Sequence, residues 1–474
     1  MSAAADHYDL VVIGAGSGNT VVDDRFSHLR VAIVERGPFG GTCLNRGCIP
    51  SKMYVHAAEL ASSARRGPAL DVGTRADGVD WPALRDRVLS RIDPVAADGE
   101  SYRRSLDHVD VLTGTARFTG PSAITVDLAD GGTRALTADD VVIATGSRPV
   151  VPDIPGLHDV AHHTSDSVMR LEALPARMVV IGGGYVGCEF ANVFAGLGVD
   201  VTQVESEDLL LATQDADVAD IVTRAARDRW TVRTGVRLDR VTPRDDGTAL
   251  LHLDDGTTVE TDVVLVAIGR RPNADLLDLG TAGVDVDDAG RVVVDEHQRA
   301  TAAGVWALGD ASAHQPLKHV ANQDARVVQH NLLHPDDLVV SDHAHVPQAV
   351  FTDPQVASVG LTEAQAREQG LDLAVGRHDL ADTAYGWALQ SDPDDRDPTG
   401  PGGFVKLIGD RATGLLVGAH VVAPEAATLI QPLIGWISTG APVAGLARRQ
   451  YWIHPAPTEV VEGALLDLEE QLGS

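Results

Sequence analysis

The sequence predicts an α/β protein with two Rossmann-like nucleotide-binding units and a third, C-terminal α+β unit. Two similar patterns predict the paired units: a hydrophobic run enters a glycine-rich turn at Gly14, and another enters a second turn at Gly182. After Asp342 the pattern changes to alternating strands and amphipathic helices without such a turn, which predicts the last unit. A chain of 474 residues, 44% of them hydrophobic, is long enough for about three domains with hydrophobic cores.

A nucleotide-binding turn is predicted near the N-terminus. The hydrophobic run at residues 8–13 is typical of a buried parallel strand and leads into GAGSGN at residues 14–19. Its glycines let backbone N–H groups approach a pyrophosphate, although Asn19 replaces the last glycine of GxGxxG. A second run, at residues 31–35, ends at Glu35, where a carboxylate can hold a ribose hydroxyl. A strand, turn and helix that bind no nucleotide are the alternative.

The stretch GGTCLNRGCIPSK at residues 40–52 holds two of the three cysteines, Cys43 and Cys48. Their spacing is wider than a zinc CxxC and Cys188 lies far along the chain, which disfavours zinc. A single structural disulfide closing so small a loop would add little stability. The remaining interpretation is a dithiol that opens and closes during turnover. Pro50 fits the first turn of a helix, which places Cys48 at the helix start, where N–H groups and the dipole stabilise a thiolate.

Helices and short strands are predicted between the two glycine-rich turns. Residues 51–64 and 81–102 have helical patterns, and Pro94 is expected to break the second helix. Short strands at residues 116–118 and 124–126 precede a buried strand at residues 140–146, which reaches a turn at Gly146. The proline-rich residues 148–155 then mark a domain boundary.

The second glycine-rich turn is a complete motif. Residues 178–181 enter GGGYVG at residues 182–187, and Glu205 ends the next strand. Residues 262–269, which end at Gly269, repeat the pattern of residues 140–146. The chain therefore contains two similar nucleotide-binding units. A reductase that uses a bound flavin and a nicotinamide donor explains this duplication, whereas a dehydrogenase with one cofactor does not.

Two segments in the last third of the chain carry candidate chemistry. The strand at residues 301–310 presents Asp310, whose carboxylate can accept hydrogen bonds from a ribityl chain; a plain strand and turn is the alternative. Near the C-terminus, Glu459 follows His454 beyond two prolines, so a carboxylate can orient the imidazole. Such an imidazole suits the general acid that a departing thiolate needs, whereas a structural histidine is the alternative. The polar loop at residues 391–403 is assigned no chemistry.

Charge and composition exclude several classes of partner. A net charge of −30 repels nucleic acid and anionic membranes. The first hydrophobic run is too short for a membrane span and no signal peptide is present, so a cytoplasmic location is expected. No metal site is expected. Lysine occurs only at Lys52, Lys318 and Lys406. The expected domains are residues 1–150 and 271–342 for the first nucleotide, 151–270 for the second and 343–474 for the C-terminal unit.

These motifs, in this order, are similar to those of the pyridine nucleotide–disulfide oxidoreductases, the family of glutathione reductase, lipoamide dehydrogenase and mercuric reductase. The resemblance covers essentially the whole chain and implies an obligate homodimer formed through the third unit. It implies that Cys48 is the thiolate beside the flavin and that Cys43 attacks the substrate. It also implies a Lys52–Glu189 ion pair near the flavin, and His454 with Glu459 acting in the partner subunit's site. The implied FAD contacts are Gly14, Gly16, Glu35, Thr42, Lys52, Gly146 and Asp310; the implied NAD(P)H contacts are Gly182, Gly184, Tyr185, Gly187, Glu205 and Gly269.

Further segments narrow the resemblance within the family. Six segments look like those of the branch that reduces mycothione, the disulfide of mycothiol. They are GSGN, HHTSDSVMR, LKHVANQDARVVQHNLL, VPQAVFTDPQVASVGLTE, AYGWA and QYWIHPAPTEVVEGALL. A lipoamide dehydrogenase or a reductase of another small disulfide is the alternative, and a redox-sensing protein without turnover is the alternative outside enzymes. Asp23 and Asp24 stand where glutathione reductases carry arginine, which disfavours glutathione disulfide. Arg46 stands where most members have a small apolar residue, so its effect on the thiol pKa values is left open.

The electron donor is expected to be NADH rather than the NADPH that the resemblance implies. Residues 203–211, which follow the second strand of the nicotinamide unit, contain three acids and no arginine. A carboxylate at Glu205 accepts hydrogen bonds from a free ribose hydroxyl but repels a phosphate. Arg270 or Arg271 would reverse this preference if either reached the same site.

Overall fold

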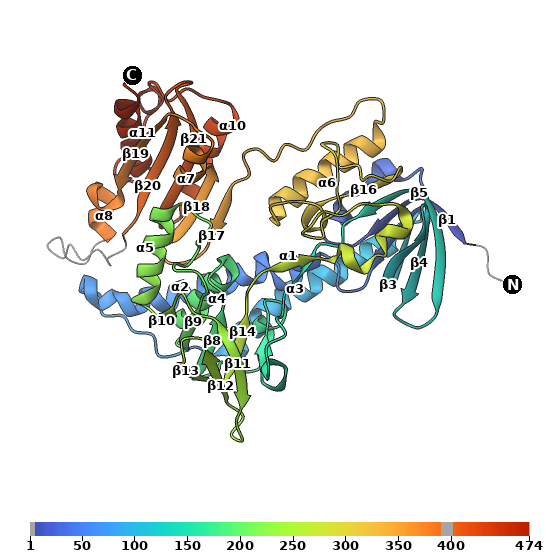
Figure 1. The fold of residues 1–474 in the computed structure, drawn as a ribbon, viewed down its shortest axis with the longest axis horizontal. Helices are drawn as coiled ribbons and strands as arrows, with labels where there is room; N and C mark the ends of the chain where they lie inside the picture. Colours follow the sequence, from blue (N-terminus) through green and yellow to red (C-terminus); the bar gives the residue numbers. More distant parts are fainter. Residues whose placement is uncertain (1–4, 390–401, 474) are drawn as a thin grey trace.

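The computed structural model describes residues 5–389 and 402–473, which form three lobes, each built on its own sheet (Figure 1). Within those ranges, no helix combines the length and the hydrophobicity that crossing a membrane requires. The polar loop predicted at residues 391–403 lies mostly outside the described residues. The α/β architecture predicted from the two glycine-rich turns is confirmed.

The first lobe is a parallel sheet extended by an antiparallel hairpin. β1 lies between β2 and β5 in parallel register, and β16, from much later in the chain, adds to β5. β3 pairs with β2 through its first half and with β4 through its second half. The strands are β1 Asp6–Ile13, β2 Val31–Glu35, β3 Val109–Gly120, β4 Ala123–Leu128, β5 Thr133–Ile143 and β16 Val305–Ala307; the helices are α1 Gly41–Arg46, α2 Cys48–Arg66, α3 Trp81–Arg104 and α6 Lys318–Leu333.

The prediction that Pro94 breaks its helix is wrong, because α3 continues through it. Val88, Ile92 and Ala96 are buried on one face of α3, whereas Pro94 lies on the exposed face. The carbonyl that loses its hydrogen bond to proline is therefore on the side of the helix that water reaches, and burial of the opposite face holds the helix together.

The second lobe repeats the parallel arrangement around the second glycine-rich turn. Its sheet has the order β10-β9-β8-β14-β7, and a small antiparallel sheet, β11-β12-β13, lies beside it. The strands are β7 His162–His163, β8 Arg177–Ile181, β9 Asp200–Val204, β10 Thr231–Arg233, β11 Leu238–Pro243, β12 Ala249–Leu253, β13 Thr258–Thr261 and β14 Val263–Val266; the helices are α4 Tyr185–Gly196 and α5 Ala216–Arg227. The two connections to the first lobe, β6 Ser147–Pro149 and β15 Arg270–Pro272, pair with each other.

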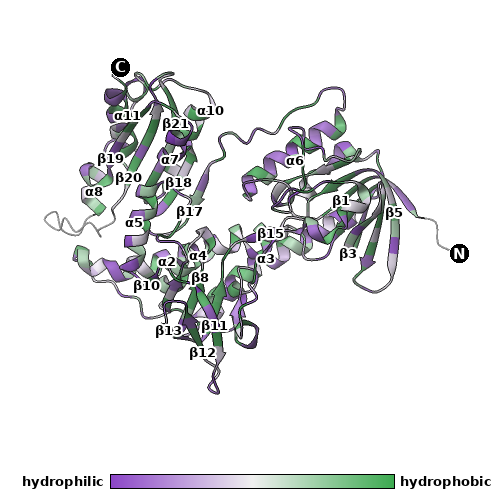
Figure 2. Cartoon of the chain, viewed as in Figure 1, coloured by the Kyte–Doolittle hydropathy of each residue, from purple (hydrophilic) through white to green (hydrophobic). Residues whose placement is uncertain are grey.

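The third lobe is an antiparallel sheet of order β17-β18-β21-β20-β19 covered by helices. Its strands are predominantly hydrophobic, whereas the helices alternate between hydrophobic and hydrophilic faces (Figure 2). The strands are β17 Gln348–Val350, β18 Gln355–Gly360, β19 Leu373–Asp379, β20 Phe404–Asp410 and β21 Leu415–Ala423; the helices are α7 Glu363–Glu368, α8 Ala384–Leu389, α9 Ala426–Leu429, α10 Gln431–Ser438 and α11 Glu459–Leu472.

Candidate active site

A cavity of about 1010 Å³ lies where the three lobes meet. Its walls come from the first glycine-rich turn, helices α1 and α2, the start of α6 and the start of α4, with α10 of the third lobe on one side. The cavity therefore combines residues that are far apart in the sequence. Among the residues predicted for the site, it is lined by Gly14, Gly16, Glu35, Thr42, Cys43, Cys48, Lys52, Gly146, Tyr185, Glu189 and Asp310.

Cys43 and Cys48 lie together in this cavity as free thiols. Cys43 lies on α1 and Cys48 is the first residue of α2, so the short turn at Gly47 brings the two helices together. A Cβ atom at Gly47 would lie 2.9 Å from the carbonyl oxygen of Thr42, which explains why the turn carries glycine. The two side chains are close enough for the Cys43 thiol to donate a hydrogen bond to a Cys48 thiolate.

The two thiols differ in acidity. The hydrogen bond from Cys43 lowers the pKa of Cys48 to about 6, against the opposing effect of burial, and the charge of Lys52 lowers this pKa further. The pKa of Cys43 is raised, first by the hydrogen bond it gives to Cys48 and then by burial. Cys48 is thus the thiolate of the pair at neutral pH, and Cys43 carries the proton.

The start of α2 also favours a thiolate at Cys48. The predicted helix start is confirmed, with Gly47 as N-cap and Pro50 in the first turn. The first N–H groups of a helix have no partner within it and carry a partial positive charge. Cys48 therefore combines a helix N-terminus, a hydrogen bond from Cys43 and a nearby ammonium group.

Lys52 and Glu189 join the first two lobes beside the cysteines. The Lys52 Nζ atom lies 2.5 Å from a carboxylate oxygen of Glu189, and α2 packs against α4 at this point. The other oxygen of Glu189 accepts a hydrogen bond of 3.0 Å from the backbone N–H of Phe351. The Phe351 ring also lies 4.5 Å from the Lys52 ammonium, so this residue of the third lobe holds both members of the pair. The sequence offered no signal for Phe351.

The first glycine-rich turn has the shape that a nucleotide requires. Gly14 has a φ of +109°, and a Cβ atom there would lie 2.3 Å from the carbonyl oxygen of Ala144. One oxygen of Glu35 accepts a hydrogen bond of 2.7 Å from the Ala15 N–H, and the other accepts one of 2.8 Å from Gly37. The Glu35 carboxylate therefore holds the turn while facing the cavity. These features fit a dinucleotide such as FAD.

The same cavity also presents Asp310. Its carboxylate accepts a hydrogen bond of 2.5 Å from the Ser147 hydroxyl, immediately after Gly146. Gly146 has a φ of +64°, with open space where a Cβ atom would lie. This arrangement leaves Asp310 at the cavity wall with acceptor capacity for a polyol chain.

The second turn repeats the construction of the first. Glu205 accepts a hydrogen bond from the Gly183 N–H with one oxygen and from the Glu207 N–H, at 2.8 Å, with the other. A Cβ atom at Gly187 would lie 2.1 Å from the carbonyl oxygen of Gly182, so α4 packs closely against the turn. Tyr185 starts α4 and lines the cavity, whereas Gly182, Gly184, Gly187, Glu205 and Gly269 lie outside it.

His454 and Glu459 form the predicted pair, but not beside the cysteines of their own chain. The Nδ1 atom of His454 lies 2.7 Å from the carboxylate of Glu459, which also accepts a hydrogen bond from the N–H of Ala456. The His454 side chain is 70% exposed, and neither residue lines the cavity. The carboxylate fixes the imidazole, while its ring remains open to another molecule.

Several polar contacts in and around the cavity were missed by sequence reasoning. Arg103 of α3 holds Asn19 through its backbone carbonyl and its side chain, which explains how the turn tolerates this residue. Arg46 pairs with Asp166 at 3.4 Å. Lys318 donates a hydrogen bond of 2.7 Å to the Ser17 hydroxyl. The rarity of lysine was the signal that could have singled out Lys318.

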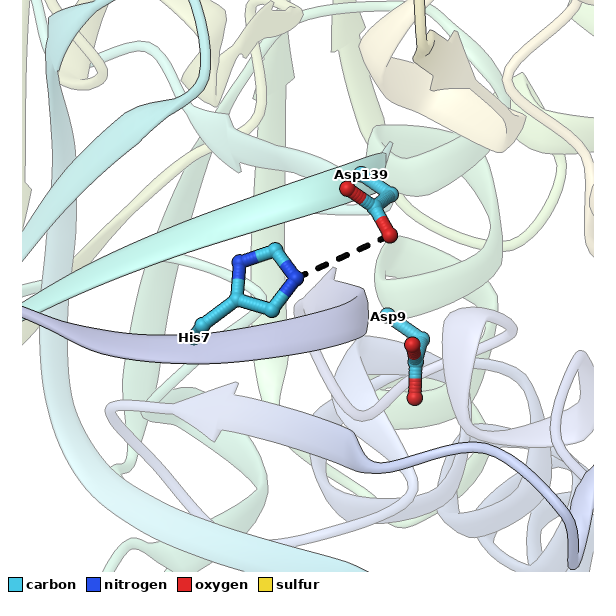
Figure 3. A group of neighbouring side chains, drawn as sticks. All are labelled: His7, Asp9 and Asp139. Atoms are coloured by element: carbon cyan, nitrogen blue, oxygen red, sulfur yellow. Dashed lines mark ion pairs between the residues drawn. The ribbon is translucent and has the colours of Figure 1, made fainter.

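One group of described residues could hold a metal ion: His7, Asp9 and Asp139, on β1 and β5 (Figure 3). His7 and Asp139 are exposed, and their side chains form an ion pair of 3.7 Å. Asp9 accepts a hydrogen bond of 2.6 Å from the backbone N–H of Arg30. The group does not line the cavity, so it has no part in the site described above.

Comparison with known proteins identifies the class. Residues 8–325 match the family described as pyridine nucleotide-disulphide oxidoreductase, and residues 346–465 match the dimerisation domain of that family. The chain belongs to this family, and it is a flavoprotein disulfide oxidoreductase. The dimerisation domain supports a homodimer.

Individual relatives narrow the comparison. The mycothione reductase of Mycobacterium tuberculosis (strain H37Rv) is 49% identical, over 97% of this chain and 99% of its own. The dihydrolipoyl dehydrogenase of Haloferax volcanii is 36% identical, over 98% of this chain and 96% of its own. Among solved structures, the HOCl-induced flavoprotein disulfide reductase RclA from Escherichia coli superposes with a TM-score of 0.83 at 28% identity, covering 97% of this chain and 99% of that one.

Proposed function

We propose that this protein reduces mycothione, the disulfide of mycothiol, to two thiols through Cys43 and Cys48, with a nicotinamide nucleotide as the electron donor. The observation that carries the proposal is the pair of free thiols, Cys43 and Cys48, in a cavity lined by both nucleotide-binding lobes. Identity of 49% to a mycothione reductase over nearly the whole chain supports the substrate. Identity of 36% to a dihydrolipoyl dehydrogenase makes dihydrolipoamide the second candidate.

The cofactor sites follow from the two turns. We assign residues 1–150 and 271–342 to FAD, 151–270 to NAD(P)H and 343–474 to the dimer interface. FAD held there would supply the relay of two electrons from the nicotinamide donor to the Cys43–Cys48 disulfide. Gly14, Gly16, Glu35, Thr42, Lys52, Gly146 and Asp310 would hold FAD, and Gly182, Gly184, Tyr185, Gly187, Glu205 and Gly269 would hold the nicotinamide nucleotide.

Substrate reduction is then thiol–disulfide exchange. His454 of the partner subunit takes the proton from Cys43, and the resulting thiolate attacks one sulfur of the substrate disulfide. This step forms a mixed disulfide with Cys43 and releases a thiolate, to which the imidazolium returns the proton. The Cys48 thiolate then attacks the Cys43 sulfur, which leaves a Cys43–Cys48 disulfide and releases the second product as a thiolate that takes its proton from water. The two electrons gained by the substrate equal the two lost by the cysteines.

The assignment of His454 to the partner's site rests on its exposure. Tyr451 is fully exposed and Ile453 is 76% exposed in the single chain, although both are hydrophobic. A homodimer contact over this segment would bury them and bring His454 against a second copy. The family's dimerisation domain, which spans residues 346–465, supports such a contact.

We also propose NADH as the preferred donor. Glu205 places a carboxylate at the end of β9, beside the second turn. Arg270 donates to Ser147 in the first lobe, and Arg271 pairs with Asp275 at 3.1 Å. These contacts engage Arg270 and Arg271 away from Glu205, which supports a donor without a 2′-phosphate.

Steady-state assays of the pure protein test the substrate. Mycothione, lipoamide and glutathione disulfide are compared at fixed ionic strength with NADH and with NADPH, and a Cys48→Ser variant measures the background. We expect the highest kcat/KM with mycothione. We also propose that the enzyme is cytoplasmic, where a nicotinamide nucleotide pool supplies the electrons. A higher kcat/KM with lipoamide would transfer the assignment to the second candidate, and no turnover with any disulfide would refute both.

A further inference from the structure

The first glycine-rich turn lacks the helix that normally follows such a turn. Between β1 and β2 the chain forms only two 3₁₀ turns, at Gly18–Thr20 and Asp24–Phe26. At the second turn, by contrast, the 12-residue α4 starts directly after Gly184. In dinucleotide-binding folds the helix N-terminus supplies partial positive charge to the pyrophosphate. A pyrophosphate at the first turn would meet backbone N–H groups but not the N-terminus of a helix that continues directly from this turn.

Two cations from other parts of the chain lie against this turn. Arg103, which is 7% exposed, donates to Asn19 and to the carbonyl oxygen of Val22, at 2.8 Å, so it holds the turn from behind. Lys318 lines the cavity and reaches the turn from the start of α6, with its Nζ atom 2.7 Å from the Ser17 hydroxyl. Its remaining N–H donors are available to a group in the cavity.

The charge of Lys318 is also not neutralised by the protein. Lys52 is paired with Glu189, and Lys406 contacts three carboxylates. Among the described residues, no carboxylate pairs with Lys318. The basic residues number 38, of which only these three are lysine. The ammonium group of Lys318 is a compact charge that can donate hydrogen bonds to a hydroxyl and to a phosphate oxygen at the same time.

We infer that Lys318 is a further FAD-binding residue, whose ammonium group contacts the pyrophosphate and replaces the charge that a first helix would provide. The inference rests on the proposed assignment of FAD to the first lobe. A bound pyrophosphate would accept hydrogen bonds from the glycine-rich turn on one side and from Lys318 on the other.

The test compares Lys318→Met with Arg326→Met in the holoenzyme. Arg326 is an exposed residue of the same helix, so its variant removes an equal charge without touching the cavity. FAD affinity is measured by diluting the holoenzyme and following the fluorescence of released flavin, and ³¹P NMR of the bound FAD reports on its phosphates. We expect Lys318→Met to weaken FAD binding about ten- to a hundredfold and to move the pyrophosphate resonances. Arg326→Met leaves both the FAD affinity and the resonances unchanged. Lys318→Arg, which keeps the positive charge, loses less FAD affinity than Lys318→Met.

A second measurement separates this role from an effect on the thiols, because the charge of Lys318 also lowers the pKa of Cys43. Alkylation of reduced enzyme is followed against pH in each variant. Unchanged FAD affinity and ³¹P resonances in Lys318→Met, with a raised pKa of Cys43, would overturn the inference and assign the lysine to the thiol. A wild-type protein that binds FAD while Lys318→Met behaves like Arg326→Met would refute the inference alone. A wild-type protein that binds no FAD would refute the proposed function with it.

Discussion

Removing the hydrogen bond that Cys43 gives to Cys48 should make Cys48 a weaker acid. The pKa of Cys48 is lowered from 9.0 to about 6, and this hydrogen bond is the largest of the causes that lower it. Burial and the charge of Glu189 act in the opposite direction. Cys43→Ala removes the donor and leaves Lys52 and the start of α2 in place.

The size of the effect follows from these opposing causes. With its pKa at about 6, about nine-tenths of Cys48 is thiolate at pH 7, whereas a thiol at the ordinary value of 9.0 would be about one-hundredth thiolate. The hydrogen bond from Cys43 acts against burial, together with the charge of Lys52 and the Cys48 backbone N–H. Because it is the largest of the lowering causes, Cys43→Ala raises the pKa of Cys48 toward 9.0 and moves the thiolate fraction at pH 7 from the first limit toward the second.

The assay is a pH titration of the long-wavelength absorbance that a thiolate produces beside oxidised flavin. Cys43→Ser is the matched control, because its hydroxyl still donates a hydrogen bond and cannot form a disulfide. Cys43→Ser should abolish disulfide reduction, keep the absorbance and titrate at a lower pH than Cys43→Ala, while Cys48→Ser loses the absorbance altogether. Equal midpoints for the alanine and serine variants would refute the hydrogen bond as the cause. Loss of the absorbance in Cys43→Ser alone would show that the roles of the two cysteines are reversed.

Three further results are expected. His454→Ala should slow the disulfide half-reaction by about a hundredfold and leave flavin reduction by the nicotinamide unchanged. Stopped-flow kinetics measures the two half-reactions separately, and equal slowing of both would mean that His454 is structural. NADH should give the higher kcat/KM, and Glu205→Arg should shift the preference toward NADPH; a clear NADPH preference in the unmodified protein would contradict the role of this carboxylate. Lys406→Met should destabilise the protein by about 3–5 kcal/mol in denaturant unfolding, since it leaves Asp215, 2.8 Å away and nearly fully buried, without its cation. The control Arg224→Met removes an exposed pair with Asp220 and should cost under about 1 kcal/mol; equal losses would show that burial does not matter here.

The sequence by itself determined the parts of the site that adjacent residues build. A hydrophobic run followed by glycines produces a strand and a tight turn, as at Gly14 and Gly182, because both depend on local backbone geometry. The spacing of Cys43 and Cys48 and the position of Pro50 likewise placed the dithiol at a helix start. The duplication of the nucleotide-binding unit was also visible, because each copy repeats the same local pattern. The pairing of Lys52 with Glu189 was anticipated only through resemblance to a family.

Tertiary structure decided what depends on segments far apart in the chain. Lys318 meets Ser17, 301 residues away, only because α6 returns to the first lobe after β16. Arg103 stabilises Asn19 only because α3 ends beside the first turn. Pro94 stays within its helix because packing of the opposite face outweighs its local cost. Such contacts are set by how the lobes pack, and the energies of packing and ion pairing are not written in any single stretch of sequence.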